Sequence, residues 1–313
     1  MKSSEPPRYP LILNPKAKGE RARRTWQFVQ EYATRFVIHA TRSRQESVEL
    51  ARALAARGEP IVAAAGGDGT LNAVVEGLAG SQTALGVFPT GTMNVFAREM
   101  GIHCQDLQKA LAILDSEERC EVDLFQMNEA PFLQMAGVGF DAKVIEETTW
   151  ASKKRLGPFS YLMTAARLLR DRPPVLELST GSGEKLEGVF ALIGNGALYG
   201  GQFKMFQAAS NRDAKLDVIV FRKLGLDFLL NSVTGLARGG IGPDFPAGSV
   251  RYLQTELLDV RCEEEVPVEL DGELWGRAGE IRFRRAAEAL RVCAPGCAPQ
   301  SGRLELLRSL KPW

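Results

Sequence analysis

Short apolar runs alternate with amphipathic segments along the first part of the chain. The apolar runs have the length of buried strands and cover residues 9–13, 36–40, 61–65 and 85–88. The segments between them space apolar and charged positions as helices do, over residues 20–32, 43–57 and 71–78. This alternation predicts right-handed crossovers over a parallel sheet, in which ligands bind at the carboxyl ends of the strands.

The pattern changes after about residue 123, where short strands are separated by glycine, proline and charged turns. The predicted strands cover residues 175–179, 189–193, 216–221, 257–262, 266–270, 281–284 and 290–293. Helical patterns are found at residues 159–169, 226–236 and 303–310. This succession of elements predicts a second domain that is rich in β-strands.

The length of the chain supports a division into two domains. At 313 residues it exceeds the size at which a single hydrophobic core usually stops growing. We expect an α/β domain over residues 1–123 and a β-rich domain over residues 124–294, with residues 295–313 able to pack back on the first. No long linker separates the two parts, so we expect them to share an interface and a cleft.

Composition and charge describe an ordinary globular protein. Hydrophobic residues make up 45% and charged residues 25%, and the formal net charge of +1 gives no reason to expect a nucleic-acid partner. Residues 1–10 lack the apolar core of a secretory signal, and no apolar stretch approaches the roughly 20 residues that cross a bilayer. We therefore expect a cytoplasmic protein. The only histidines, His39 and His103, lie in no motif that favours a Ser-His-Asp hydrolase.

The sharpest motif is the run Gly-Gly-Asp-Gly-Thr at residues 66–70, between the apolar run 61–65 and a helix that begins near Leu71. Its glycines allow a tight turn and a close approach to phosphates, and the N–H groups of a helix start favour anions. Asp68 has the chemistry to hold Mg²⁺ or to accept a hydroxyl proton. The alternative is a plain strand-to-helix turn in which Asp68 or Thr70 caps the helix.

Two other nucleotide motifs fit less well. The run 66–70 lacks the Gly-Lys-Ser/Thr ending of a P-loop, which disfavours the usual P-loop NTPase fold. Residues 137–142 (GVGFDA) resemble part of the dinucleotide fingerprint, but no βαβ pattern or ribose-binding acid follows them. We interpret this segment as a close contact between a strand and a helix.

Charged side chains near both ends of the chain supply further site residues. Asp271 and Glu273 flank Gly272 after an apolar alternation, so a turn at a strand end presents their carboxylates. An ordinary turn is the alternative. Basic residues crowd the first loop and the helix after it, at Lys16, Lys18, Arg21, Arg23 and Arg24. We expect Lys16 and Arg21 to contact phosphates and most of the others to lie on a solvated helix face.

Taken in order, these motifs resemble the diacylglycerol kinase catalytic-domain superfamily, which includes bacterial diacylglycerol kinases, sphingosine kinases and ceramide kinases and is distantly related to NAD kinases. The matching segments are LNP at 13–15, the run 66–70, FPTGTMNVFAR at 88–98, VDL at 122–124, residues 137–142 and DGE at 271–273, so that the resemblance covers roughly residues 9–294. It implies an N-terminal, NAD kinase-like α/β domain with a parallel sheet that binds the nucleotide. It also implies a C-terminal β-sandwich that binds the lipid, with catalysis in the cleft between them.

The activity that the resemblance implies is transfer of the γ-phosphoryl group of ATP, with Mg²⁺, to a hydroxyl of a membrane lipid such as diacylglycerol or a sphingoid base. It implies that Asp271 is the general base, assisted by Glu273, whereas in the sphingosine-kinase branch the residue that matches Asp68 is proposed as the base. We favour Asp271 as the base and Asp68 as the Mg²⁺-linked residue, with Asp123 as a second metal ligand. The implied ATP contacts, beside Lys16 and Arg21, are Asn14, Thr41, Gly66, Gly67, Gly69, Thr70, Gly91, Thr92 and Asn94.

Several positions depart from the family pattern. Val95 stands where the family has aspartate, Ala73 stands where it has glutamate, and the opening loop reads KAKG at 16–19. Residues 207–217 match only in part a segment that holds a structural Mg²⁺ in some relatives, so we expect no metal there. These departures leave two alternatives open, an NAD kinase-like enzyme that phosphorylates a soluble nucleotide and a catalytically inactive relative that binds nucleotide or lipid.

A lipid substrate implies peripheral, reversible contact with a membrane. Basic residues lie beside the apolar positions of residues 156–162, at Lys153, Lys154, Arg155, Arg167, Arg170 and Arg172. Each basic residue near an anionic leaflet contributes roughly 1 kcal/mol, which is enough in this number for transient attachment. An ordinary amphipathic core helix is the alternative. The sequence specifies neither the lipid nor an oligomeric state, and it is compatible with an oligomer.

Overall fold

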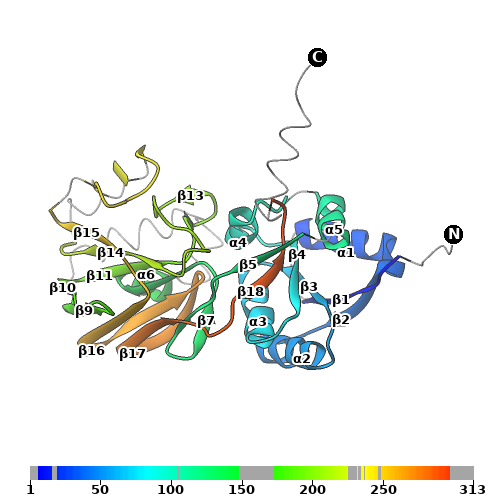
Figure 1. Ribbon diagram of the computed structural model, residues 1–313, viewed down its shortest axis with the longest axis horizontal. Helices are drawn as coiled ribbons and strands as arrows, with labels where there is room; N and C mark the ends of the chain where they lie inside the picture. The colour runs from blue at the N-terminus through cyan, green and yellow to red at the C-terminus, as the bar shows by residue number, and fades with distance from the viewer. Residues whose placement is uncertain are drawn as a thin grey trace, which may run out of the picture. The chain divides into compact units, whose positions relative to one another are not determined.

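The computed structural model describes residues 6–15, 20–104, 106–116, 118–147, 173–224, 231, 234–235, 237–245 and 248–296. These residues form two compact units (Figure 1). The first unit holds the chain up to Val122 and again from Ala287, and the second unit is Asp123–Ala286. The predicted helices at 159–169 and 303–310, most of the one at 226–236, and the basic segment 153–172 lie outside the described residues. Within the described part, no helix has both the length and the apolar character needed to cross a bilayer.

A six-stranded sheet in the order β2-β1-β3-β4-β18-β5 forms the centre of the first unit. Its strands are β1 (Tyr9–Leu13), β2 (Phe36–Ala40), β3 (Ile61–Gly66), β4 (Ala84–Pro89), β5 (Arg119–Val122) and β18 (Leu290–Cys293). The first four strands and β18 run parallel, and β5 runs antiparallel to β18. The predicted parallel sheet is therefore confirmed. Strands β1, β3 and β4 are buried throughout, as crossover connections on both faces require.

Helices cover both faces of this sheet (Figure 1). On one face lie α1 (Glu20–Glu31) and α5 (Leu107–Asp115), whose Phe28 and Leu111 join a core with Phe88. On the other face lie α2 (Arg44–Ala56) and α3 (Asp68–Leu78). These two helices approach so closely that a Cβ atom on Gly77 would meet the Val48 carbonyl oxygen at 2.4 Å. Two short elements, η1 (Ala33–Arg35) and α4 (Val95–Glu99), complete the unit.

Strand β18 belongs to the first unit, whereas the sequence pattern assigned residues 290–293 to the second domain. It lies between β4 and β5, where Val292 pairs with Leu85 on one side and with Cys120 on the other. The apolar pattern of this strand would suit either sheet, so the pairing partners decide its place. The chain enters the second unit at Asp123 and returns to the first at Ala287.

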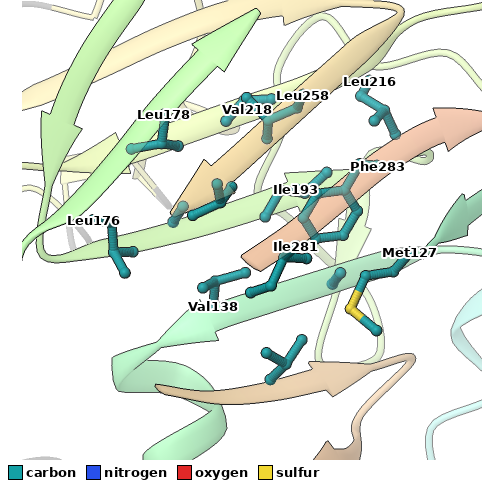
Figure 2. Packing of buried hydrophobic residues seen from close by; sticks show 14 of the residues in the cluster. Met127, Val138, Leu176, Leu178, Ile193, Leu216, Val218, Leu258, Ile281 and Phe283 are labelled. Atoms are coloured by element: carbon teal, nitrogen blue, oxygen red, sulfur yellow. The ribbon is translucent and has the colours of Figure 1, made fainter. Parts of the chain in front are cut away.

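The second unit is a sandwich-like arrangement of antiparallel strands. Its main sheet follows the order β15-β14-β11-β8-β16-β17-β6-β7, and β9 joins it beside β16 and pairs with β10. The strands are β6 (Phe125–Met127), β7 (Ala130–Phe132), β8 (Met135–Gly139), β9 (Leu176–Thr180), β10 (Lys185–Gly188), β11 (Phe190–Gly194), β14 (Leu216–Phe221), β15 (Val250–Thr255), β16 (Leu257–Leu270) and β17 (Glu273–Arg285). Figure 2 shows how Val138, Leu258 and Phe283 come from different strands into one buried apolar core.

Strand β16 is longer than the sequence pattern predicts. Residues 257–262 and 266–270 were expected as separate strands, because the exposed residues 263–265 interrupt the apolar alternation. The structure instead keeps one strand paired with β17, with a shift of register between Arg261 and Val266. A β-bulge of this kind inserts extra residues into a strand without ending it, so polar residues in the sequence need not mark a turn.

A helix covers the outer face of β8 and β11. α6 (Phe140–Glu147) starts directly after β8, and its Phe140 packs on Phe190 in a second apolar cluster. Gly139 makes this junction with φ of +93°, and a Cβ atom there would meet the Val189 carbonyl oxygen at 3.2 Å. The predicted strand-to-helix contact at residues 137–142 is thus confirmed. The neighbours of β8 are antiparallel, unlike those of a dinucleotide-binding strand.

Candidate functional site

The carboxyl ends of β1, β3 and β4 lie side by side because these strands are parallel neighbours. A cavity of about 300 Å³ opens at this edge, between the strand ends and α1. Asn14 and Thr90, which follow β1 and β4, line it together with Arg23 and Trp26 of α1. Asn14 is among the residues predicted from the sequence to contact ATP. Trp26 is not, because a tryptophan on a charged helix gives no signal beyond amphipathicity.

The two glycine-bearing loops after β3 and β4 contact each other directly through backbone atoms. The Thr90 N–H donates to the Gly66 carbonyl oxygen at 2.9 Å. A Cβ atom on Gly91 would lie 2.5 Å from the Cα atom of Gly67, and one on Gly67 would lie 3.3 Å from the Cα atom of Gly91. Real Cβ atoms essentially never approach as closely as 2.5 Å, so Gly91 requires glycine for packing, whereas a Cβ atom on Gly67 would need its neighbour to shift by a few tenths of an ångström. The structure thus brings the predicted segments 66–70 and 91–94 together.

Helix α3 begins at Asp68, earlier than the sequence pattern predicts. Gly67 is its N-cap with an extended backbone, so Asp68, Gly69 and Thr70 form the first helical turn. The carboxylate of Asp68 is half-buried at the positive end of the helix dipole, where negative charge is favoured. Its Oδ1 also lies 3.4 Å from the N–H of Phe96 in α4. Through this contact the first glycine loop, which carries Asp68, meets the start of α4.

Arg21 and Asn94 hold the second glycine loop in place. The Nη1 atom of Arg21 donates to the carbonyl oxygens of Gly91 at 2.7 Å and of Thr92 at 2.9 Å. Asn94 has φ of +49° and is 0% exposed, and its Nδ2 donates a hydrogen bond to the Gly91 carbonyl oxygen at 2.8 Å. Asn94 was predicted to contact ATP, but its complete burial favours a positioning role beneath the loop. Lys16 lies outside the described residues.

Thr41 is also buried, with 1% of its surface exposed. Its Oγ1 lies 2.8 Å from Oγ of Ser47 in α2, and its N–H donates to the Leu13 carbonyl oxygen at 2.9 Å. These bonds join the end of β1 to the start of α2. The predicted direct contact between Thr41 and ATP is therefore not supported, because a side chain with almost no exposed surface is not accessible to a ligand.

In the second unit, Asp271 and Gly272 form the turn between β16 and β17. Their φ values are +50° and +85°, the combination that a tight two-residue hairpin requires and that Asp-Gly adopts readily. The turn chemistry alone would explain the two residues, as the alternative interpretation held. The carboxylate does more, however, because it accepts the N–H groups of Leu133 at 2.9 Å, Gln134 at 2.8 Å and Met135 at 3.1 Å.

Two glutamates flank this turn in different environments. Glu273 is exposed at the start of β17. Glu269 is 0% exposed, and its Oε2 accepts the Gly272 N–H at 2.8 Å. The sequence gives no signal for Glu269, because a residue that alternates with Val268 and Leu270 is typical of the solvent face of a strand. Its burial means that the turn is fixed by carboxylates from both Asp271 and Glu269.

Asp123, the second predicted metal ligand, is a buried carboxylate that forms an ion pair with the partly exposed Arg285. Its Oδ1 lies 2.8 Å from Nε and 2.5 Å from Nη2 of Arg285, and its Oδ2 accepts the Ala214 N–H at 2.7 Å. A guanidinium group in this position already neutralises the carboxylate and would repel a cation. The prediction of a metal at Asp123 is therefore not supported. Among the described residues no group of three or more metal-ligating side chains converges.

The partly matching segment 207–217 ends in another buried carboxyl group. Asp217 is 0% exposed and accepts hydrogen bonds from Oη of Tyr252 and from Nε2 of Gln254. Burial raises the pKa of Asp217 to about 6, and its hydrogen bonds reduce that effect. A carboxyl group held by a phenol and an amide has a structural role between β14 and β15.

Known protein families match both units. The diacylglycerol kinase catalytic domain matches residues 8–127, and the YegS C-terminal NAD kinase beta sandwich-like domain matches residues 134–294. A protein of Pseudomonas aeruginosa described as "probable lipid kinase YegS-like" is 32% identical over 92% of this chain and 95% of its own length. A diacylglycerol kinase of Bacillus subtilis is 30% identical over 76% of this chain and 79% of its own length.

A solved structure shows the same fold. The crystal structure of a diacylglycerol kinase from Bacillus anthracis superposes with a TM-score of 0.71 and covers 95% of this chain and 100% of its own, at 19% sequence identity. The N-terminal α/β domain with its parallel sheet and the C-terminal sandwich-like domain are those of this fold family. On this evidence the chain belongs to the diacylglycerol kinase catalytic-domain superfamily of lipid kinases.

Proposed function

We propose that this chain is an ATP-dependent lipid kinase that transfers the γ-phosphoryl group to a hydroxyl of diacylglycerol or a sphingoid-type lipid. The observation that carries the proposal is the backbone contact between Gly67 and Gly91 at the carboxyl edge of a parallel sheet. Glycine positions in these loops carry no side chain, so a polyphosphate can come close to the backbone N–H groups at a helix start. The lipid kinase relatives, which match most of the chain, support the class of acceptor.

We assign nucleotide binding to the first unit. When bound, ATP supplies the phosphoryl group and Mg²⁺ neutralises the charge that develops on it. Mg²⁺ commonly takes only one or two carboxylates and completes its shell with water and phosphate oxygens, which fits Asp68 without a larger acidic cluster. Asn14 and the cavity beside Trp26 offer further contacts, and Arg21 and Asn94 hold the loop that carries Thr92.

We assign proton removal from the acceptor hydroxyl to Asp271. The backbone N–H groups of residues 133–135 fix the orientation of its carboxylate, and an oriented carboxylate is a group that can accept a proton from a substrate hydroxyl. Glu273, two residues further along and exposed, assists it. Asp68 is the alternative base. If Asp271 is the base, an Asp271 variant should bind ATP normally and transfer the phosphoryl group slowly; if Asp68 is the base, an Asp68 variant should behave in this way.

The direct experiment offers the protein ATP labelled in the γ position, Mg²⁺, and a panel of diacylglycerol, sphingosine, ceramide, phosphatidylglycerol and a polyprenol, with NAD in a parallel reaction. We expect label in a lipid and none in NAD. Label in NAD alone would move the assignment to the soluble-nucleotide kinase. Binding of ATP without transfer to any acceptor would support the inactive relative.

A further inference from the structure

Exposed apolar side chains follow directly after the Asp271 turn. Leu274 is 41% exposed and Trp275 is 45% exposed, although a hairpin between two sheet strands normally hides such residues on one face. Phe203, on a separate hairpin of β12 (Leu198–Tyr199) and β13 (Phe203–Lys204), is 56% exposed, and Lys204 beside it is exposed as well. We call Phe203, Lys204, Leu274 and Trp275 the hairpin-tip patch.

A β-bulge accounts for the exposure of Trp275. Leu274 pairs with Glu269 and Gly276 pairs with Val268, so Trp275 is an extra residue without a partner across the hairpin. Gly276 takes φ of +154°, a conformation that L side chains rarely adopt. Bulges turn a side chain away from the direction that the strand would give it, and they are frequent beside functional sites. Here the bulge presents an indole ring to solvent close to the Asp271 turn.

Hydrogen bonds tie the two hairpins to one another through Gln134. The backbone N–H of Gln134 donates to Oδ1 of Asp271 at 2.8 Å, and its side-chain Nε2 donates to the Leu198 carbonyl oxygen at 3.1 Å. Leu198 lies in β12 and pairs with Lys204 of β13. The turn with Asp271 and the ribbon with Phe203 are therefore both anchored on Gln134, which contacts the proposed base within the same unit.

The area of the patch favours a bilayer over a protein partner. A buried aromatic side chain covers about 150–250 Å², so three apolar side chains that are about half-exposed offer roughly 300 Å². A stable protein interface needs about 800 Å² from each partner. Tryptophan and lysine, in contrast, are the side chains that settle at the boundary between headgroups and acyl chains. A few such anchors are enough for reversible contact with a membrane surface.

We propose that the hairpin-tip patch docks on the surface of a lipid bilayer and that Trp275 enters its interfacial layer. This inference rests on the proposed lipid kinase function, because it explains how a hydroxyl of a membrane lipid reaches Asp271. Docking through residues next to the turn keeps the base at the depth of the headgroups, where the acceptor hydroxyl lies. The patch acts on access to the substrate and takes no part in the phosphoryl transfer.

The first test measures insertion of Trp275 without any turnover. A variant with Trp26, Trp150 and Trp313 replaced by phenylalanine retains Trp275 as its only tryptophan. Vesicles of phosphatidylcholine and phosphatidylglycerol should shift its emission to the blue, and brominated acyl chains should quench it. An emission spectrum that vesicles leave unchanged would overturn the inference, whether or not the protein is a kinase.

The second test compares two forms of the same acceptor. In the full-length protein, Leu274→Ser with Trp275→Ser should weaken vesicle sedimentation about tenfold, the effect of removing about half-exposed apolar surface at two positions. The ratio of activity on diacylglycerol in vesicles to activity on a monomeric short-chain diacylglycerol should fall by a similar factor. Val175→Ser is the matched control, since Val175 is an exposed apolar residue of the same unit outside the patch.

The outcomes separate the inference from the proposed function. Equal vesicle binding of the double variant and the wild type, with lipid phosphorylation intact, rejects the patch and leaves the kinase assignment standing. Vesicle binding that depends on Trp275 in a protein that phosphorylates no lipid rejects the kinase assignment instead. Self-association that disappears in the double variant, with no change in vesicle binding, would identify the patch as a contact between two copies of the chain.

Discussion

Replacing Gly91 with alanine tests whether the two glycine loops must touch. Neither Gly91 nor Gly67 has a positive φ, so alanine is compatible with their backbone and the effect of a substitution is steric. A Cβ atom on Gly91 would lie 2.5 Å from the Cα atom of Gly67 and 2.7 Å from Oδ1 of Asn94. Carbon atoms prefer a separation of about 3.5–4.0 Å, so the loops must move apart by roughly 1 Å.

The expected magnitude follows from this displacement. Overpacking of this kind costs about 1–3 kcal/mol of the free energy of unfolding. A misplacement of about 1 Å around reacting groups lowers the rate about 100-fold, which is the fall we expect in kcat/KM for ATP in Gly91→Ala. Gly67→Ala has a milder contact of 3.3 Å with Gly91, so the neighbour must give only a few tenths of an ångström and its effect should be clearly smaller.

Three measurements are needed for each variant. They are the Kd for a non-hydrolysable ATP analogue by calorimetric titration, the stability by thermal unfolding, and the rate of phosphoryl transfer. Gly248→Ala is the matched control, because a Cβ atom there meets nothing within 4 Å and its φ is not positive. We expect the order Gly91→Ala, Gly67→Ala, Gly248→Ala from the largest loss to none. Wild-type affinity and rate in Gly91→Ala would refute the argument that the loop contact builds the nucleotide site.

Three further predictions concern buried polar groups. Arg285→Ala should lower the free energy of unfolding by about 2 kcal/mol, which is less than for a fully buried ion pair because Arg285 is partly exposed. Adding Asp123→Asn to this variant should restore part of the loss. If the losses of the two single variants simply add in the double variant, the ion pair is contradicted. The free energy of unfolding should fall by up to about 3 kcal/mol as the pH rises from about 4 to about 6, because folding raises the pKa of Asp217 and the folded protein holds this proton more tightly. Chemical denaturation across this pH range should show the slope in the wild type and no such slope in Asp217→Asn. Thr41→Val should cost about 1 kcal/mol of stability while ATP affinity stays within about twofold, whereas a large loss of affinity would restore Thr41 as a direct contact.

The sequence predicts the first unit well because its signals are local. Residues 9–13 and 36–40 are apolar runs bounded by polar residues, and they form β1 and β2 with the predicted bounds. The glycine run 66–70 marks the strand-to-helix turn for the same reason. The pairing of β18 with β4 could not be predicted, because it depends on a contact between residues more than two hundred positions apart and not on the pattern of the strand itself.

The site residues divide along the same line. The strand-to-helix position of Asp68 and the Asp-Gly turn could be predicted, since both depend on short motifs with a defined backbone conformation. The burial of Thr41 and Asn94 and the ion pair of Asp123 with Arg285 were not, because each depends on which distant segment packs beside it. Glu269 shows the limit most clearly, because its position between Val268 and Leu270 is typical of a solvent-facing strand residue, whereas the fold around the turn buries it.

The most direct test of the account separates ATP binding from phosphoryl transfer in Asp271→Asn. Asparagine keeps one acceptor oxygen for the N–H groups of residues 133–135 and removes the base, so the variant should fold. In Asp271→Asn, single-turnover transfer of labelled phosphate to the lipid acceptor should fall about 100-fold or more, while the Kd for the ATP analogue stays unchanged. Asp68→Asn is the comparison variant. Transfer at the wild-type rate in Asp271→Asn would contradict the account.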